Sequence, residues 1–261
     1  MSCPGPRVIL EFWHPSDTGL LARLHSRGLV DAAFAADLPL GNANFDSLAA
    51  ALSAQSLGVP ALPAVSLGAR SAAASVSRIL TAHASGLAGV VLVAGDSRAC
   101  QDSLGVLDAL RIASSLPRVT EGLRVSAPLR AALRERPCFL RGAAVDPASE
   151  RSVRLARSKV EAGANLLLSQ LLTDPSSAAG ALDRLASLGV PVALGIPYAP
   201  TEAARSRLES ITGARAPEPR ELLRSLESLP GRLRSHAYVS PLGQSREGLE
   251  QFLESLASIL D

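Results

Sequence analysis

The chain has 261 residues, of which 47% are hydrophobic, 3% aromatic and 19% charged, and we expect them to form a single domain spanning residues 1–261. A net charge of +2, spread along the chain, gives no electrostatic argument for binding nucleic acid or an anionic membrane. The sequence contains neither an apolar run of the ~20 residues that span a bilayer nor a signal-peptide pattern, so we expect a cytoplasmic protein.

Short apolar runs alternate with amphipathic stretches along the whole chain. The runs predict strands at 7–13, 30–37, 59–66, 88–95, 137–145, 164–170, 190–196 and 236–240. Apolar residues at three- and four-residue intervals predict helices at 16–27, 45–57, 71–85, 102–115, 149–162, 175–188, 200–211 and 245–260. Eight such units, with strands that are apolar on both faces, predict a (β/α)8 TIM barrel.

The turns between these elements support the same architecture. A glycine falls after each of five predicted helices and before the next strand, where a left-handed residue ends a helix, at Gly28, Gly58, Gly86, Gly163 and Gly189. Two segments break the regular spacing and predict extra helices, at 116–136 before strand 5 and at 212–234 before strand 8. An open doubly wound sheet is the alternative fold, although eight even repeats favour a closed barrel.

Ligand-contacting residues of such barrels lie at the carboxyl ends of the strands. Glu11 interrupts an otherwise apolar strand, and a carboxylate inside a barrel is costly unless it is paired or has a raised pKa. Glu11 is therefore either a general acid or the partner of an arginine across the barrel. The other strand ends bring further candidate residues to the same face: Asp37, Ser66, Arg70, Gly95, Asp96, Asp146, Ser169, Gln170, Tyr198 and Ser240.

Two of these residues, and Lys159 on a predicted helix, each leave two interpretations open. Asp96 follows Gly95, which lets a ligand approach the backbone, but aspartate is also a common helix N-cap. Gln170 offers a donor and an acceptor to a flat heterocycle, and is equally often structural. Lys159 is the single lysine among 26 basic residues, and it is either a point charge for a phosphate or a solvated helix residue. The cysteines and histidines lack the spacing of metal ligands, so we expect no metal.

Taken together, these segments resemble the methylenetetrahydrofolate reductase family. The resemblance rests on Leu10-Glu11-Phe12-Trp13-His14-Pro15 in strand 1, Gly95-Asp96 at the end of strand 4, and 191–197 in strand 7. Its most specific part is the segment from Lys159 through Asn165 to Ser169-Gln170. A histidine at the end of strand 3 and the arginine before Gly-Asp, both typical of that family, are missing here.

The resemblance implies a cytoplasmic flavoprotein of one-carbon metabolism and methionine biosynthesis. FAD would pass hydride from NADH or NADPH to 5,10-methylenetetrahydrofolate or a related methylene-pterin. Glu11 would be the catalytic acid, Asp96 would tune the flavin and contact the substrate, and Gln170 and Tyr198 would bind the substrate. Lys159, Gly95, Asp96, Ser66, Arg70, Asp37 and Ala144 would contact the cofactor.

Two alternatives remain at this stage. One is a flavin-free barrel of the same kind that acts as a binding or complex-forming subunit. The other is a barrel lyase or synthase that acts on a phosphorylated substrate, with Lys159 holding the phosphate. In each case we expect a small-molecule substrate, no nucleic acid or membrane partner, and a possible homo-oligomer.

Overall fold

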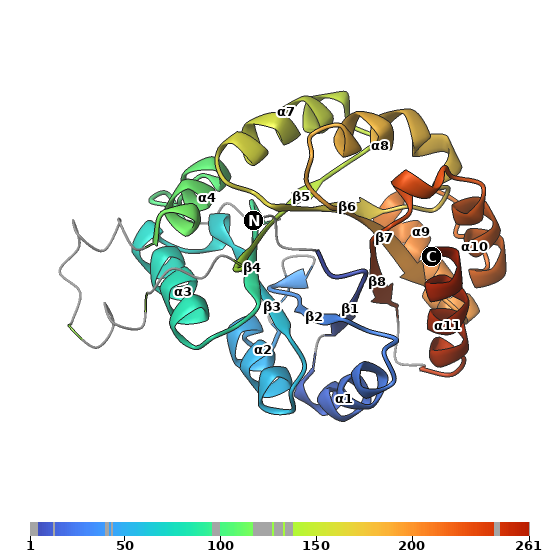
Figure 1. Cartoon of the computed structure of the whole chain (residues 1–261), viewed down its shortest axis with the longest axis horizontal. Coiled ribbons are helices and arrows are strands. Elements are labelled where there is room, and N and C mark those ends of the chain that lie inside the picture. The colour runs from blue at the N-terminus through green and yellow to red at the C-terminus, as the bar shows by residue number, and fades with distance from the viewer. Residues whose placement is uncertain are drawn as a thin grey trace.

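A computed structural model describes residues 5–12, 14–39, 42, 44–95, 100–116, 127, 133, 138–242 and 246–260. Eight parallel strands pair in chain order and close into a barrel (Figure 1). The strands are β1 (Val8–Phe12), β2 (Ala32–Ala35), β3 (Ala61–Ser66), β4 (Gly89–Val93), β5 (Leu140–Val145), β6 (Leu166–Leu171), β7 (Val192–Tyr198) and β8 (Ala237–Pro241). The pairing of β1 with β8 closes the barrel, with Ile9 opposite Tyr238, and confirms the predicted fold.

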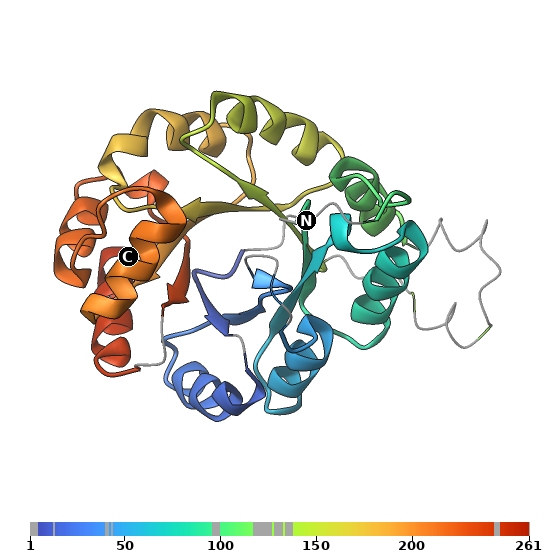
Figure 2. The same cartoon turned by 180° about the vertical axis from the view of Figure 1, so that it is seen from behind.

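Helices surround the barrel, as both views show (Figures 1 and 2). Those described are α1 (Thr18–Ser26), α2 (Ser47–Ser56), α3 (Ala72–Ala84), α4 (Val106–Ser114), α7 (Glu150–Glu161), α8 (Ala179–Ala186), α9 (Glu202–Thr212), α10 (Pro219–Glu227) and α11 (Leu249–Leu260). Single 3-10 turns occur at η1 (Pro15–Asp17), η3 (Leu67–Ala69), η4 (Ser176–Ala178) and η5 (Gly231–Leu233). Of the two predicted insertions, α10 confirms the second, whereas 116–136 lies almost entirely outside the described residues.

The apolar core has two layers because strand side chains alternate between the two faces of the sheet. The inner layer fills the barrel and takes at least one side chain from every strand, including Ile9, Leu62 and Val91. The larger outer layer lies between the barrel and the helices and includes Leu10 and Phe12 of β1. Residue 11 therefore shares the inward face with Ile9, which places Glu11 inside the barrel.

The five predicted turn glycines all have positive φ angles, as expected for residues that end helices in a left-handed conformation. At Gly163 the requirement is steric as well as conformational. Its φ is +111°, and a Cβ atom there would lie 2.5 Å from Cβ of Ser114 on α4. Gly163 thus lets the turn after α7 pack directly against the neighbouring helix. Among the described helices, none combines the length and apolarity needed to cross a bilayer.

Candidate functional site

A buried hydrogen bond lies at the carboxyl end of the barrel interior. The Tyr238 hydroxyl on β8 donates to Oε2 of Glu11 on β1 at 2.6 Å. Glu11 is only 7% exposed, and Tyr238 packs against the apolar side chains of the inner layer. One partner of Glu11 is therefore a neutral phenol from the adjacent strand.

The surroundings of Tyr238 keep its proton on the phenol. Burial is the largest effect and raises the pKa of Tyr238 well above its usual value, and the charge of Glu11 and the hydrogen bond to it act in the same direction. A hydrogen bond with Ser240 opposes these effects. The Tyr238 ring also makes an edge-to-face contact with Phe34, at a centroid distance of 5.3 Å. The phenol is thus held in place as a donor to the carboxylate.

The residues at and just after the ends of β2 and β3 form a second polar group, whose members bond one another. Arg70 donates to both carboxylate oxygens of Asp37, at 2.6 and 2.9 Å. The Ser66 amide donates to the same carboxylate at 2.8 Å, and the Ser66 hydroxyl donates to the Asp37 carbonyl at 2.9 Å. Asp37, Ser66 and Arg70 are therefore brought together as expected, but their polar atoms are engaged with one another.

Lys159 lies on α7, between that helix and the barrel wall. Its ammonium group donates to the carbonyl oxygen of Ala144 on β5 at 2.6 Å, and burial lowers its pKa. This bond uses one of the three N–H donors of the ammonium group. Lys159 and Ala144 are thus adjacent, although the bond between them serves the packing of α7 on β5.

Three further residues were predicted to contact substrate or cofactor: Tyr198, Gly95 and Asp96. Tyr198 is 2% exposed, and its hydroxyl donates to the backbone carbonyl of Glu247, before α11. The hydroxyl oxygen of Tyr198 can still accept a hydrogen bond while it donates to Glu247. Gly95 has a φ of +82°, and a Cβ atom there would lie 3.2 Å from Cβ of Ser66. Asp96 lies outside the described residues.

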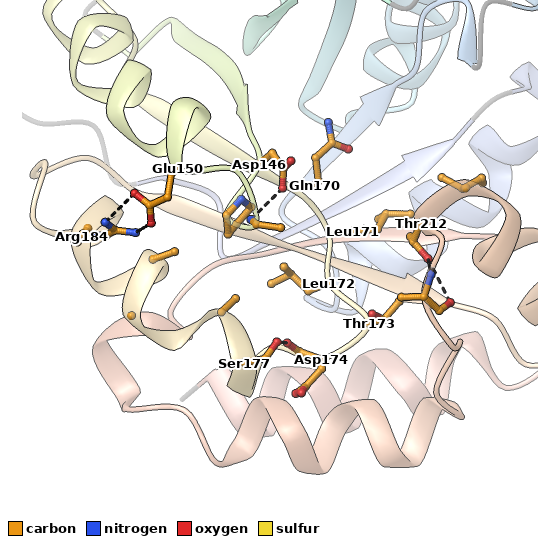
Figure 3. Close-up of a pocket in the computed structure, with 17 residues that line it drawn as sticks. Asp146, Glu150, Gln170, Leu171, Leu172, Thr173, Asp174, Ser177, Arg184 and Thr212 are labelled. Carbon is orange, nitrogen blue, oxygen red and sulfur yellow. Dashed lines mark hydrogen bonds and ion pairs between the residues drawn. The ribbon is translucent and has the colours of Figure 1, made fainter.

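An open cleft of about 960 Å³ lies beside the ends of β5 and β6 (Figure 3). Gln170 and Asp146 come from adjacent strand ends, since Val145 pairs with Ser169, and their labelled side chains lie close together in Figure 3. Glu150 and Arg184 form an ion pair on one wall, with contacts of 2.6 and 3.1 Å. Thr173, Asp174, Ser177 and Thr212 line the remainder of the polar surface.

An aromatic pair stands outside the barrel, in the loops that follow β1 and β2. The His14 and Phe45 rings meet edge to face with centroids 4.4 Å apart, and Phe45 is 50% exposed. Sequence analysis noted His14 but missed Phe45 and Tyr238. The sequence alone could have pointed to Tyr238. The alternation of side chains along β8 places it on the inward face, and a buried tyrosine hydroxyl needs a hydrogen-bond partner.

The two cations expected to contact FAD have protein partners in the structure. Arg70 is engaged with Asp37, and Lys159 with the Ala144 carbonyl. FAD binding and the individual site roles stay predictions. Within the described parts of the chain, no group of three or more His, Cys, Asp and Glu side chains is placed to hold a metal ion.

No protein-family model matches the chain, and no curated protein matches it in sequence. Solved structures resemble it in fold. An uncharacterised protein from Clostridium thermocellum that binds two copies of 5-methyl-5,6,7,8-tetrahydrofolic acid is 13% identical, with a TM-score of 0.58, and the match covers 97% of this chain and 94% of that chain. A 2,3-dimethylmalate lyase of the PEP mutase/isocitrate lyase superfamily is 14% identical, with a TM-score of 0.55 and coverage of 97% and 78%. An oxaloacetate acetylhydrolase bound to oxalate is 13% identical, with a TM-score of 0.54 and coverage of 90% and 74%.

At these identities the likeness establishes the (β/α)8 barrel and nothing finer. It nevertheless contradicts the expectation of an NAD(P)H-dependent flavin oxidoreductase, because these neighbours include lyases and hydrolases of the PEP mutase/isocitrate lyase type. The folate resemblance keeps one coarse point of support, a neighbouring barrel that binds methyltetrahydrofolate. These comparisons do not show that the chain belongs to the methylenetetrahydrofolate reductase family.

The most specific segment of the sequence resemblance, from Lys159 through Asn165 to Ser169-Gln170, includes residues that the fold itself uses. Gly163 packs against Ser114, and Asn165 bonds β5 by accepting from the Arg141 amide at 2.6 Å and donating to the Phe139 carbonyl at 3.1 Å. A motif that builds the junction of α7 with β6 can recur in barrels with different chemistry.

Proposed function

We propose that this barrel is a lyase-type enzyme in which Glu11, held by Tyr238, transfers a proton to or from a small hydroxy- or oxo-compound. The observation that carries the proposal is the 2.6 Å hydrogen bond between these two side chains inside the barrel. A carboxylate in this position serves as a general base and, once protonated, as a general acid. Lyases with the same fold support the reaction class, and the contacts of Glu11 and Tyr238 support the residue assignment.

The cleavage of a β-hydroxy acid illustrates the expected step. The Glu11 carboxylate removes the hydroxyl proton, and the electron pair of the O–H bond forms the new carbonyl group. The carbon–carbon bond breaks, and its electron pair becomes the enolate of the second product. Protonated Glu11 then returns the proton to the enolate carbon, so the step balances without an oxidant or reductant. Tyr238 keeps the carboxylate oriented through its hydrogen bond.

Proton exchange in D2O tests this proposal directly. The first panel of candidate substrates is oxaloacetate and 2,3-dimethylmalate, named in the two enzymes reported above, and phosphonopyruvate, named in a phosphonopyruvate hydrolase with a similar fold. Nuclear magnetic resonance would follow both cleavage and the exchange of carbon-bound hydrogen for deuterium. We expect Glu11→Gln to lower the rate at least ~100-fold, the usual contribution of a general acid–base group. Glu161→Gln, at an exposed position on α7, is the matched control. A Glu11→Gln enzyme with the wild-type rate, or a panel without any reaction, would count against the proposal.

A second candidate function is flavin-free binding of a reduced folate or another pterin. It is favoured by the exposed ring of Phe45 at the strand-end face, which offers a surface for stacking a planar heterocycle. The methyltetrahydrofolate-binding barrel from Clostridium thermocellum supports it at the level of the fold. Isothermal titration with 5-methyltetrahydrofolate tests it. Binding that weakens in Phe45→Ala and persists in Glu11→Gln would support this candidate over the lyase.

A further inference from the structure

A second cavity lies at the amino ends of β7 and β8, so it is at the end of the barrel opposite to the strand-end site. Its volume is about 380 Å³, within the ~300–1,000 Å³ range of small-molecule sites in proteins. Helix α8, the turn η5 and the residues that precede the two strands surround it. Apolar side chains line it: Leu182, Val190, Pro191, Val192, Leu194 and Leu233. The cavity therefore offers an apolar ligand a place that is separate from the cleft beside β5 and β6.

The charge in this cavity is balanced. Arg232 is the charged residue of the described lining, and its Nε and Nη2 atoms donate to Oδ1 of Asp183 at 3.1 and 2.7 Å. No carboxylate belongs to the described lining itself. An ion would lose hydration against the apolar wall without meeting an unpaired opposite charge there, whereas a neutral ligand has no such cost. The cavity thus favours a neutral ligand.

The polar feature of the cavity is the ring of His236, directly before β8. Its Nδ1 atom lies 2.9 Å from the carbonyl oxygen of Pro6. A carbonyl oxygen can only accept, so the neutral ring carries its proton on Nδ1 and keeps a lone pair on Nε2. Among the described residues, Nε2 has no hydrogen-bond partner. It is therefore the acceptor that the ring offers to a ligand in the cavity.

The backbone around His236 holds the ring in this position. The His236 carbonyl accepts from the Leu194 amide on β7 at 3.0 Å. Gly5 passes close by on the other side, because a Cβ atom there would lie 2.9 Å from Cβ of Pro191 and 3.4 Å from Cε1 of His236. The acceptor is thus part of the folded barrel, and a ligand would find it already oriented.

We propose that this cavity is a second ligand site, which binds a neutral compound with a compact apolar ring and a hydroxyl group, such as a phenol, through an O–H···N bond to Nε2 of His236. The hydroxyl group supplies the donor that the lone pair on Nε2 lacks. The ring buries its surface against the apolar wall. This site is independent of the proposed reaction, because its residues lie at the other end of the barrel from Glu11 and Tyr238.

Phenol and anisole test this recognition without a known natural ligand. Anisole is the methyl ether of phenol, so it has the same ring and no donor. Nuclear magnetic resonance at pH 8, where a phenol with a pKa of about 10 is neutral, would follow the imidazole signals of His236 during titration. We expect phenol to bind at least ~fivefold more tightly than anisole, the effect of about one hydrogen bond. Equal affinity for the two probes would overturn the proposal.

Asparagine substitutions separate the Nε2 acceptor from the other contacts of a histidine. His236→Asn keeps an N–H donor for the Pro6 carbonyl and removes Nε2, so the preference for phenol should disappear. His25 is the matched control, because its Nδ1 also contacts a backbone carbonyl, that of Val30 at 2.7 Å, but the residue does not line the cavity. His25→Asn should keep the preference. A preference that persists in His236→Asn would contradict the role of Nε2.

The place of binding has a separate test that leaves the histidine intact. Ala186 lines the cavity from α8, and a leucine there would fill part of the space and suit a helix. Both probes should bind at least ~fivefold more weakly to Ala186→Leu, and unchanged affinity would place the ligand elsewhere. If His236→Asn does not fold, the wild-type titration decides: signals that move at His14, at the other end of the barrel, and not at His236 would refute the site. Glu11→Gln should leave these titrations unchanged, so failure of the proposed reaction and failure of this site are distinguishable.

Discussion

The Tyr238 hydroxyl and the Glu11 carboxylate lie 2.6 Å apart, although 227 residues separate them along the chain. They come from the last and the first strand, so the bond forms only when the barrel closes between β8 and β1. The bond joins the two strands that close the barrel and holds the candidate acid–base group. Its loss should therefore affect both the stability of the fold and the proposed chemistry.

Removing the phenol oxygen should destabilise the protein measurably. Tyr238→Phe keeps the ring against Phe34 but leaves the Glu11 carboxylate without this donor, and we expect a loss of about 1–3 kcal/mol in the free energy of unfolding. Urea denaturation monitored by circular dichroism would measure it. The double variant Tyr238→Phe/Glu11→Gln should lose less than the sum of the single variants, and strict additivity would mean that the two groups do not interact.

Breaking the pair of Arg70 with Asp37 should be costly. Arg70→Ala removes both charge-assisted bonds and leaves a carboxylate that is almost fully buried, so we expect a loss of about 3 kcal/mol. Arg70→Lys should restore only part of it, because an ammonium group cannot make the two parallel bonds. Exposed Arg111, which pairs with Asp108 on α4, gives the comparison: Arg111→Ala should cost less than ~1 kcal/mol. Equal costs at the two sites would contradict the importance of burial.

The burial of Lys159 predicts a dependence of stability on pH. Because burial lowers the pKa of Lys159 in the folded state, the unfolded chain binds its proton more tightly. The folded state is penalised at neutral pH, and the penalty disappears as the pH rises through the lowered pKa toward 10.5. The difference in Tm between wild type and Lys159→Met should therefore shift in favour of wild type between pH 7 and pH 10. Taking this difference cancels the titration of Tyr238, and a constant difference would disprove the effect.

Substitutions at Gly163 and Gly28 should distinguish the energetic cost of a steric clash from the cost of a left-handed backbone conformation. Both have positive φ angles, but a Cβ atom at position 163 would collide with Ser114, whereas position 28 is open. We expect Gly28→Ala to cost about 1 kcal/mol, from the left-handed conformation alone. Gly163→Ala should cost at least about 2 kcal/mol, because the packing of α4 must shift as well. Thermal unfolding of the two variants and of Gly163→Ala/Ser114→Gly would measure the difference. A double variant no more stable than Gly163→Ala would exclude the Ser114 contact as the cause.

Much of the fold followed from local sequence pattern. Strand and helix periods, together with the glycines at the helix ends, predicted the eight-unit barrel, and α10 confirmed one of the two inserted helices. The inward position of Glu11 also followed, because a strand alternates its side chains and the neighbours of Glu11 are apolar. Such patterns involve residues a few positions apart, so they can be read directly from the chain.

The partners of the site residues were decided only by the tertiary structure. The sequence left the partners of Glu11 and Lys159 open, and the closed barrel brings the Tyr238 hydroxyl to Glu11 and the Ala144 carbonyl to Lys159. Arg70 is engaged by Asp37, and a one-residue shift between β6 and β7 sets the place of Gln170. These contacts depend on strand register, barrel closure and side-chain rotamers, which join residues far apart in the chain. The sequence alone therefore determined the architecture and the inward carboxylate, whereas the folded barrel determined which polar groups remain available to a ligand.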